Sequence, residues 1–311
     1  MKKTLLTICL VWMCFSLSAQ KIIDLSGKWS FSIDRQDNGE KEKWFSHTLN
    51  DFINLPGSMP EKLKGDEVTA KTQWTGSLYD SSYYYNPYME KYRKEGNIKF
   101  PFFLTPDKHY VGAAWYQKEV NIPADWKGER ILLFLERPHI ETTVWVNGQK
   151  TGIQNSLCVP HQYDITRYVR PGKCTITIRV DNRIKEINVG PDSHSITDQT
   201  QGNWNGIVGR ICLQTTPKTY FDDIQIYPEP EQKLARVKVV IKGTGTAKVK
   251  LSAESFNTDK KHIVPAIQQE IKLNKGVTET EMVLPMGNDM LLWDEFHPAL
   301  YKLKAEVTNG K

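Results

Sequence analysis

Segment 198–206 combines side chains that can bind a hydroxyl-rich ligand. Its sequence, Asp-Gln-Thr-Gln-Gly-Asn-Trp-Asn-Gly, holds the carboxylate of Asp198, the amides of Asn203 and Asn205, and the indole of Trp204. These groups offer hydrogen-bond acceptors and donors beside an aromatic face, as sites for small polar ligands do. The alternative is that the same side chains only hold the loop and the turn at Gly206.

Other groups with catalytic potential have no recognisable partners in the sequence. His161 and His194 could transfer protons, but each is isolated from any recognisable partner. The acidic residues are scattered, and no spacing selects a pair of carboxylates. We therefore name no catalytic residue. No metal-ligand or cofactor motif occurs, so we expect neither a metal nor a cofactor.

The five cysteines fall into two groups. Cys9 and Cys14 lie in an N-terminal apolar run, whereas Cys158, Cys174 and Cys212 lie far apart in the rest of the chain. Three thiols allow at most one disulfide, and their spacing does not match a metal site. We expect all three to be small, buried apolar residues on strands.

Residues 1–19 have the order of a secretory signal peptide. Two lysines precede an apolar run over residues 5–17, and small residues follow as far as Ala19. The run is too short to span a bilayer comfortably. We expect cleavage near Ala19 and a periplasmic or secreted protein. Acylation of Cys14 as a lipoprotein anchor is the less favoured alternative, because the residues before it are not small.

The charge balance argues against a nucleic-acid-binding protein. The chain carries 41 basic and 36 acidic residues, a formal net charge of +5, and the basic residues form no long run. No segment after the signal peptide is apolar enough to cross a membrane.

The chain beyond the signal peptide alternates as strands do. Residues 25–34 place Trp29, Phe31 and Ile33 on one face. Residues 130–136 are so apolar that they predict a central strand. Asn147 and Gly148 follow a strand-like run and predict a hairpin, because both turn positions need positive φ. Further strands are predicted at residues 115–122 and 174–181.

Residues 61–110 form the least regular stretch. Glycine and proline interrupt it repeatedly, and one short helical turn is predicted at residues 89–94. We expect a long loop or insertion with an aromatic surface. Its aromatic residues include Trp74, Tyr79, Tyr83, Tyr84, Tyr85, Tyr88 and Tyr92.

The composition changes near Thr216 and Pro217. Short strands at roughly ten-residue spacing are then predicted at residues 223–227, 236–241, 247–255, 277–284 and 300–307. The fold class is therefore all-β. We predict a jelly-roll β-sandwich over residues 20–217, followed by a smaller immunoglobulin-like β-sandwich over residues 218–311.

A series of segments, taken together and in order, resembles the front part of family 2 glycoside hydrolases, the β-galactosidase and β-glucuronidase group. The segments are Leu25-Ser-Gly-Lys-Trp-Ser-Phe31, Leu55-Pro-Gly-Ser58, Gly112-Ala-Ala-Trp-Tyr116 with Ile122-Pro123, Val144-Trp-Val-Asn-Gly148 with Gly152, Tyr163-Asp-Ile-Thr166, Val180-Asp-Asn182, Asn203-Trp-Asn-Gly-Ile-Val-Gly209, and Trp293 through Pro298-Ala-Leu-Tyr301. The resemblance implies a galactose-binding-like jelly roll and an immunoglobulin-like domain. We interpret most of these motifs as structural, and expect Trp145 in the core.

The resemblance also implies where the chemistry occurs. In that family, two glutamates on a later barrel domain act as acid/base and nucleophile. Residue 311 falls about where the link to that barrel should begin, so the catalytic residues are expected outside this chain. A loop of the first domain reaches the barrel's active site in the family. Here that loop would be segment 198–206, which makes Asp198, Asn203, Trp204 and Asn205 the predicted substrate-binding residues.

Two main hypotheses follow. The first is a non-catalytic part of an exported β-glycosidase that acts on a glycan or oligosaccharide substrate, and that in its full-length form could be a homo-oligomer. The second is a stand-alone carbohydrate-binding protein whose aromatic insertion binds glycan. A third, weaker hypothesis is a structural remnant without a ligand. The sugar and the linkage stay open at this point.

Overall fold

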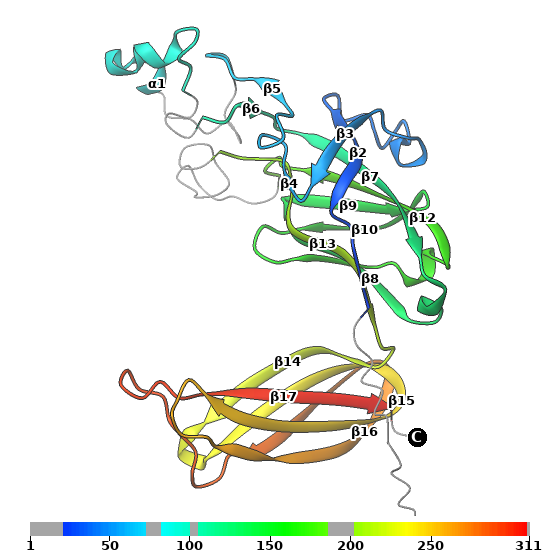
Figure 1. The fold of residues 1–311 in the computed structure, drawn as a ribbon, viewed down its shortest axis with the longest axis vertical. Helices are drawn as coiled ribbons and strands as arrows, with labels where there is room; N and C mark the ends of the chain where they lie inside the picture. The colour runs from blue at the N-terminus through cyan, green and yellow to red at the C-terminus, as the bar shows by residue number, and fades with distance from the viewer. Residues whose placement is uncertain (1–20, 73–81, 100–104, 186–201, 310–311) are drawn as a thin grey trace, which may run out of the picture. The chain divides into compact units, whose positions relative to one another are not determined.

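The computed structural model describes residues 21–72, 82–99, 105–185 and 202–309. By their internal contacts they form two compact units (Figure 1). The first unit contains residues up to 127 and residues 131–215. The second contains residues 216–311 together with 128–130. Each unit is built from antiparallel strands, as predicted.

Two sheets form the first unit. The five-stranded sheet has the order β1 (Ile22–Asp24), β13 (Gly206–Thr216), β8 (Arg130–His139) and β11 (His161–Asp164), with β4 (Gly57–Ser58) also paired to β13. The six-stranded sheet has the order β10 (Gln149–Asn155), β9 (Glu141–Val146), β12 (Gly172–Asp181), β7 (Ala113–Ile122), β2 (Gly27–Asp34) and β3 (Asp51–Leu55). This is the predicted jelly-roll sandwich, and β8 is an interior strand, as its apolar sequence indicated.

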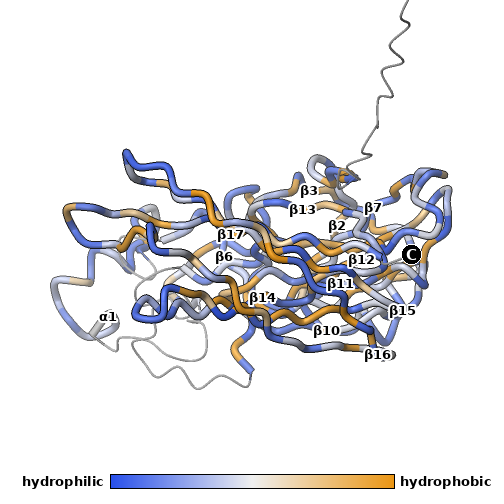
Figure 2. Tube along the Cα trace, turned by 90° about the horizontal axis from the view of Figure 1, so that it is seen from below, coloured by the Kyte–Doolittle hydropathy of each residue, from blue (hydrophilic) through white to orange (hydrophobic). Residues whose placement is uncertain are grey.

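The main core joins these two sheets. Successive side chains of a strand point to opposite faces, so only one set points inward to the core. Hydrophobic residues are therefore interspersed with hydrophilic ones along the strands (Figure 2). Trp29 and Phe31 of β2 are buried there, with Ile33 packed at the margin. Tyr116 of β7 and Leu133 of β8 are fully buried in the same cluster. The predicted one-sided face of residues 25–34 is confirmed.

A second, aromatic core belongs to the same unit. Trp115 of β7 and Trp145 of β9 stack with their ring centroids 5.0 Å apart, and Phe45 stacks on Trp145 at 5.2 Å. Neighbouring residues on a strand point to opposite faces, so Trp115 faces away from the main core that holds Tyr116. The 3-10 helix η1 (Trp44–Ser46) contributes Trp44 and Phe45 to this cluster. Trp145 is therefore a core residue, as predicted.

The hairpin and the irregular stretch agree with their sequence signals. Asn147 and Gly148 have φ values of 49° and 76° between β9 and β10. In the irregular stretch lie β5 (Asp66–Glu67), the short α1 (Ser82–Tyr85), the 3-10 helix η3 (Pro87–Arg93) and β6 (Lys108–His109). Tyr84, Tyr85 and Tyr88 are exposed. Trp74 and Tyr79 lie outside the described residues, as does the side chain of Tyr83.

The second unit has fewer and longer strands than predicted. It contains β14 (Tyr220–Glu229), β15 (Leu234–Phe256), β16 (Ile263–Pro285) and β17 (Leu300–Asn309). Residues 236–241 and 247–255 were predicted as separate strands, but they belong to β15, which has 23 residues. A register shift between Gly243 and Gly245 marks a bulge across which the pairing to β16 continues, so no turn forms there. The immunoglobulin-like class is confirmed; the number of strands was wrong.

The cysteine prediction was correct for two residues and wrong for the third. Cys174 on β12 and Cys212 on β13 are buried. Cys158 is exposed, because it lies in the loop between β10 and β11 rather than on a strand. All three thiols are free. Burial raises the pKa of the Cys174 thiol to about 11, so it is a poor nucleophile at neutral pH.

Candidate functional site

Asn205 anchors the described end of the candidate loop inside the first unit. Its Nδ2 donates to the carbonyl oxygens of Gly112 at 2.9 Å and Val180 at 3.0 Å. Its Oδ1 accepts a 2.8 Å hydrogen bond from the hydroxyl of Tyr116. Two carbonyls can only accept, so this network fixes which end of the amide is nitrogen. Asn205 is 1% exposed, and these bonds tie the loop to β7 and β12.

Asn203 joins the same network through a second asparagine. Its Nδ2 donates to the carbonyl oxygen of Asn182 at 3.0 Å, and the Nδ2 of Asn182 lies 3.4 Å from the Oδ1 of Asn203. Asn182 also accepts from the N–H of Gly112 at 2.8 Å and donates to the carbonyl of Tyr110 at 2.9 Å. The pair therefore joins residue 203 of the candidate loop to residue 182, just after β12, and to residues 110–112 at the end of the irregular stretch.

Trp204 differs from both neighbours because it is only partly buried. Its indole stacks on the ring of His139, with the centroids 4.5 Å apart. The Nδ1 of His139 lies 2.6 Å from the carbonyl oxygen of Trp204. A carbonyl only accepts, so Nδ1 carries the proton in this tautomer. The buried His139 at the end of β8 thus sets the orientation of the indole.

Gly206 is required by a close approach of two strands. It begins β13 with φ of 145°, and a Cβ there would lie 2.5 Å from the carbonyl oxygen of Gly57 and 2.8 Å from the Cα of Ser58. Gly206 and Ser58 are paired residues of β13 and β4. Only glycine combines this φ with this spacing. Gly206 therefore has a structural role. It brings the motif of residues 203–209 next to the motif of residues 55–58.

The remaining predicted residues have different surroundings. Asp198 and His194 lie outside the described residues. His161 is buried, with its Nε2 3.0 Å from the carbonyl of Ser156 and its Nδ1 2.6 Å from the hydroxyl of Thr142. Both ring nitrogens of His161 therefore make contacts within the fold. The side-chain amides of Asn203 and Asn205 already form hydrogen bonds inside the fold. Sugar binding by these two residues stays a prediction.

A group of ion pairs lies at the end of β12 and in the residues that follow it. The carboxylate of the fully buried Asp181 lies 2.6 Å from Arg183, 3.0 Å from Lys185 and 3.0 Å from Arg179. Burial alone would raise the pKa of Asp181, but hydrogen bonds from Arg183 and Lys185 outweigh it and lower the pKa. Asp181 is therefore an ionised structural group and a poor proton donor.

A shallow hollow of about 520 Å³ opens beside these pairs. Its charged lining residues are all engaged in ion pairs, including Asp37 with Arg179 and Glu40 with Lys150. The hollow therefore offers a ligand no unpaired charge. Within the described ranges, no group of three or more His, Cys, Asp and Glu side chains could hold a metal ion.

Comparison with known proteins identifies the family. Residues 22–217 match the family model for the sugar binding domain of glycosyl hydrolases family 2, and residues 219–311 match a second model of glycosyl hydrolases family 2. The chain therefore belongs to family 2 of the glycosyl hydrolases. Of the helices that the structure describes, none has the length and apolar character needed to cross a membrane.

The individual relatives are distant and longer. The chain is 24% identical over 319 residues to human β-glucuronidase, which covers 92% of this chain and 41% of that protein. It is 24% identical over 287 residues to a β-galactosidase of Clostridium acetobutylicum, covering 90% and 28%. The fold matches the apo β-glucuronidase of Ruminococcus gnavus with a TM-score of 0.60 at 19% identity, covering 94% and 43%. The chain thus spans less than half the length of each.

Sequence reasoning missed three residues of this site. Tyr116, Asn182 and His139 hold Asn205, Asn203 and Trp204, respectively. Tyr116 and Asn182 did stand in recognised motifs, so their presence was visible but their partners were not. His139 had no signal, because its role depends on a contact with a residue 65 positions away.

Proposed function

We propose that this chain is the non-catalytic sandwich region of an exported family 2 glycoside hydrolase. In this proposal, the loop ending at Trp204 forms part of the wall of the substrate site. The observation that supports it is the partly buried Trp204, whose indole is stacked on the buried His139. An aromatic face held in one orientation can contact a sugar without a large loss of side-chain freedom on binding.

The charges of the described site region support a role without catalysis. A retaining glycosidase needs one carboxyl group with a raised pKa as its acid. Asp181 and Asp37, which share Arg179 and Arg183 as ion-pair partners, both have a lowered pKa. For each, burial opposes the shift and hydrogen bonds from arginine prevail. We infer that the catalytic carboxylates lie in a further domain.

The substrate in this proposal is a β-glycoside. The relatives include proteins named β-glucuronidase and β-galactosidase, so both sugars are candidates. The alternative function is a carbohydrate-binding protein without hydrolase activity. The observation that favours it is the exposure of Tyr84, Tyr85 and Tyr88 in the irregular stretch, because several exposed aromatic rings can contact a glycan.

The first test is a panel of nitrophenyl β-glycosides (glucuronide, galactoside and mannoside) with the purified chain. We expect no turnover above the buffer blank with any of them. Turnover that disappears when a carboxylate of this chain is replaced would contradict the proposal, because it would reveal an active site within these residues.

A second test is the gene sequence beyond Lys311, which should continue in frame into a barrel-encoding region. An immediate stop codon would favour the carbohydrate-binding alternative.

A third test addresses the indole of Trp204 in the longer enzyme that such a gene would encode. In that longer enzyme, Trp204→Ala should lower kcat/KM about tenfold or more, equivalent to about 1.4 kcal/mol. Phe52→Ala, which removes an exposed ring on β3, is the control and should leave kcat/KM unchanged.

A further inference from the structure

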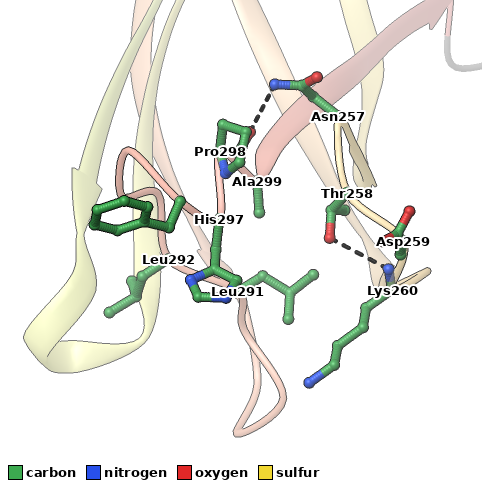
Figure 3. A pocket seen from close by; sticks show the side chains of 10 residues that line it. Asn257, Thr258, Asp259, Lys260, Leu291, Leu292, His297, Pro298 and Ala299 are labelled. Atoms are coloured by element: carbon green, nitrogen blue, oxygen red, sulfur yellow. Dashed lines mark hydrogen bonds between the residues drawn. The ribbon is translucent and has the colours of Figure 1, made fainter.

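The second unit contains a hollow that the proposed function does not use. Its volume is about 680 Å³, within the range of roughly 300–1,000 Å³ found for small-ligand sites. Two loops line it: residues 257–260, between β15 and β16, and residues 291–299, before β17. Figure 3 shows Leu291 and His297 between Leu292 on one side and Thr258, Asp259 and Lys260 on the other.

One wall is apolar and projects into solvent. Phe296 is 81% exposed and Leu292 is 60% exposed, which is unusual for two large apolar side chains of one loop. Their loop is held in place. The Oδ1 of Asp294 accepts from the N–H of Phe296 at 2.8 Å and of His297 at 2.6 Å. A β-bridge between Trp293 and Pro298 closes the loop. The aromatic ring is thus displayed from a pre-formed turn.

The facing wall is polar, and it is tied to the first. The Nδ2 of Asn257 donates to the carbonyl oxygen of Pro298 at 2.9 Å, which joins the two loops. The N–H of Lys260 donates to the hydroxyl of Thr258 at 3.2 Å, which fixes the turn. Within the described residues, the carboxylate of Asp259 and the ammonium of Lys260 form no ion pair, so both are available to a ligand.

We propose that this hollow binds a pyranose unit of a neutral, β-linked glycan. A β-linked pyranose is two-sided in the same way, because its axial C–H groups form an apolar face and its hydroxyls both donate and accept hydrogen bonds. Phe296 and Leu292 contact the apolar face. Asp259 accepts from the hydroxyls, and Lys260 donates to them. One carboxylate and one ammonium leave the polar wall without net charge, which favours a neutral sugar over an ion.

Titration followed by ¹H–¹⁵N NMR tests this site on the purified chain. The probes are cellotetraose and β-1,4-galactotetraose, two neutral glycans that carry such a face. We expect saturable shifts confined to the backbone amides of residues 258–260 and 291–299, with a Kd of about 0.1–10 mM. Phe296→Ala should weaken binding about fivefold or more, since the replaced ring is exposed and its loss does not disturb a core.

Tyr227→Ala is the matched control, because Tyr227 is an exposed aromatic residue of the same unit outside the hollow, and it should leave the Kd unchanged. Absence of shifts with both sugars overturns the proposal, as does binding that Phe296→Ala does not alter. Concentration-dependent line broadening without sugar, removed by Phe296→Ala, also overturns it and identifies a protein-docking surface. The site does not depend on the proposed function: shifts near Trp204 would report that site separately.

Discussion

The hydroxyl of Tyr116 donates a 2.8 Å hydrogen bond to the Oδ1 of Asn205, 89 residues further along the chain. Tyr116 lies in the main core of the jelly roll, and Asn205 lies at the base of the candidate sugar-binding loop. The core and the site therefore share a buried polar contact. Because Asn205 also bonds to Gly112 and Val180, its side chain connects two strands of one sheet to the loop.

Replacement of Asn205 should destabilise the first unit. Asn205→Ala leaves the carbonyls of Gly112 and Val180 and the hydroxyl of Tyr116 without their partner, and each unsatisfied buried group costs about 1–3 kcal/mol. We expect a loss of about 3 kcal/mol or more in the free energy of unfolding, measured by urea denaturation. Asn121→Ala, on an exposed position of β7, should change it by less than about 0.5 kcal/mol. Equal losses in the two variants would contradict this role.

The aromatic core should not tolerate a methyl group at Gly39. A Cβ there would lie 2.5 Å from the indole nitrogen of Trp115 and 2.7 Å from the Oδ2 of Asp34, which accepts from that nitrogen. Gly39→Ala is expected to lower the stability by about 1–3 kcal/mol through overpacking. Gly152→Ala is the matched control, because its Cβ would make only ordinary contact with Tyr163 at 3.5 Å. Thermal unfolding of both variants checks this, and a neutral Gly39→Ala would refute the tight packing.

The three described thiols should differ in reactivity. In the chain expressed from residue 20, Ellman's reagent at pH 8 should titrate only Cys158 in the native state, because Cys174 and Cys212 are buried. Burial also raises the pKa of both buried thiols. Guanidinium should expose two further equivalents. Cys158→Ser should abolish the native reaction; if a fast-reacting thiol remained, the buried placement of the other two would be wrong.

The stability of the first unit should fall below neutral pH through His161. Burial lowers the pKa of His161, so its unfolded form, with a pKa near 6.5, binds a proton more readily than the folded form. The contribution is complete above about pH 6.5 and is lost as the pH falls toward the folded pKa, at most about 1.4 kcal/mol per pH unit.

Urea unfolding at pH 7 and at pH 5 measures this loss. The difference between the two free energies should be smaller in His161→Gln than in the unmodified chain. His47→Gln removes an exposed imidazole and should keep the full difference. Asp181, whose pKa is also lowered, acts in the same direction, but mainly below about pH 4, outside this range. An unchanged difference in His161→Gln would exclude His161 as the source.

Local sequence patterns determined the kind of structure. The alternation of Trp29, Phe31 and Ile33 predicted a one-sided strand, and Asn147-Gly148 predicted the hairpin. Both depend only on neighbouring residues, because side-chain period and positive φ are properties of the local backbone. The family motifs were also readable, since each is a short run of residues. The all-β class and the family followed from such patterns alone.

Tertiary structure decided what those patterns do. From the sequence, Asn203, Trp204 and Asn205 were all predicted to bind substrate. The fold buries the two amides in hydrogen bonds to Asn182, Gly112 and Val180, and leaves Trp204 only partly buried. Likewise, residues 236–241 and 247–255 were predicted as separate strands, but both pair with β16 and belong to one strand, with a register shift between Gly243 and Gly245. Burial and pairing depend on residues tens of positions away, and no local pattern contains that information.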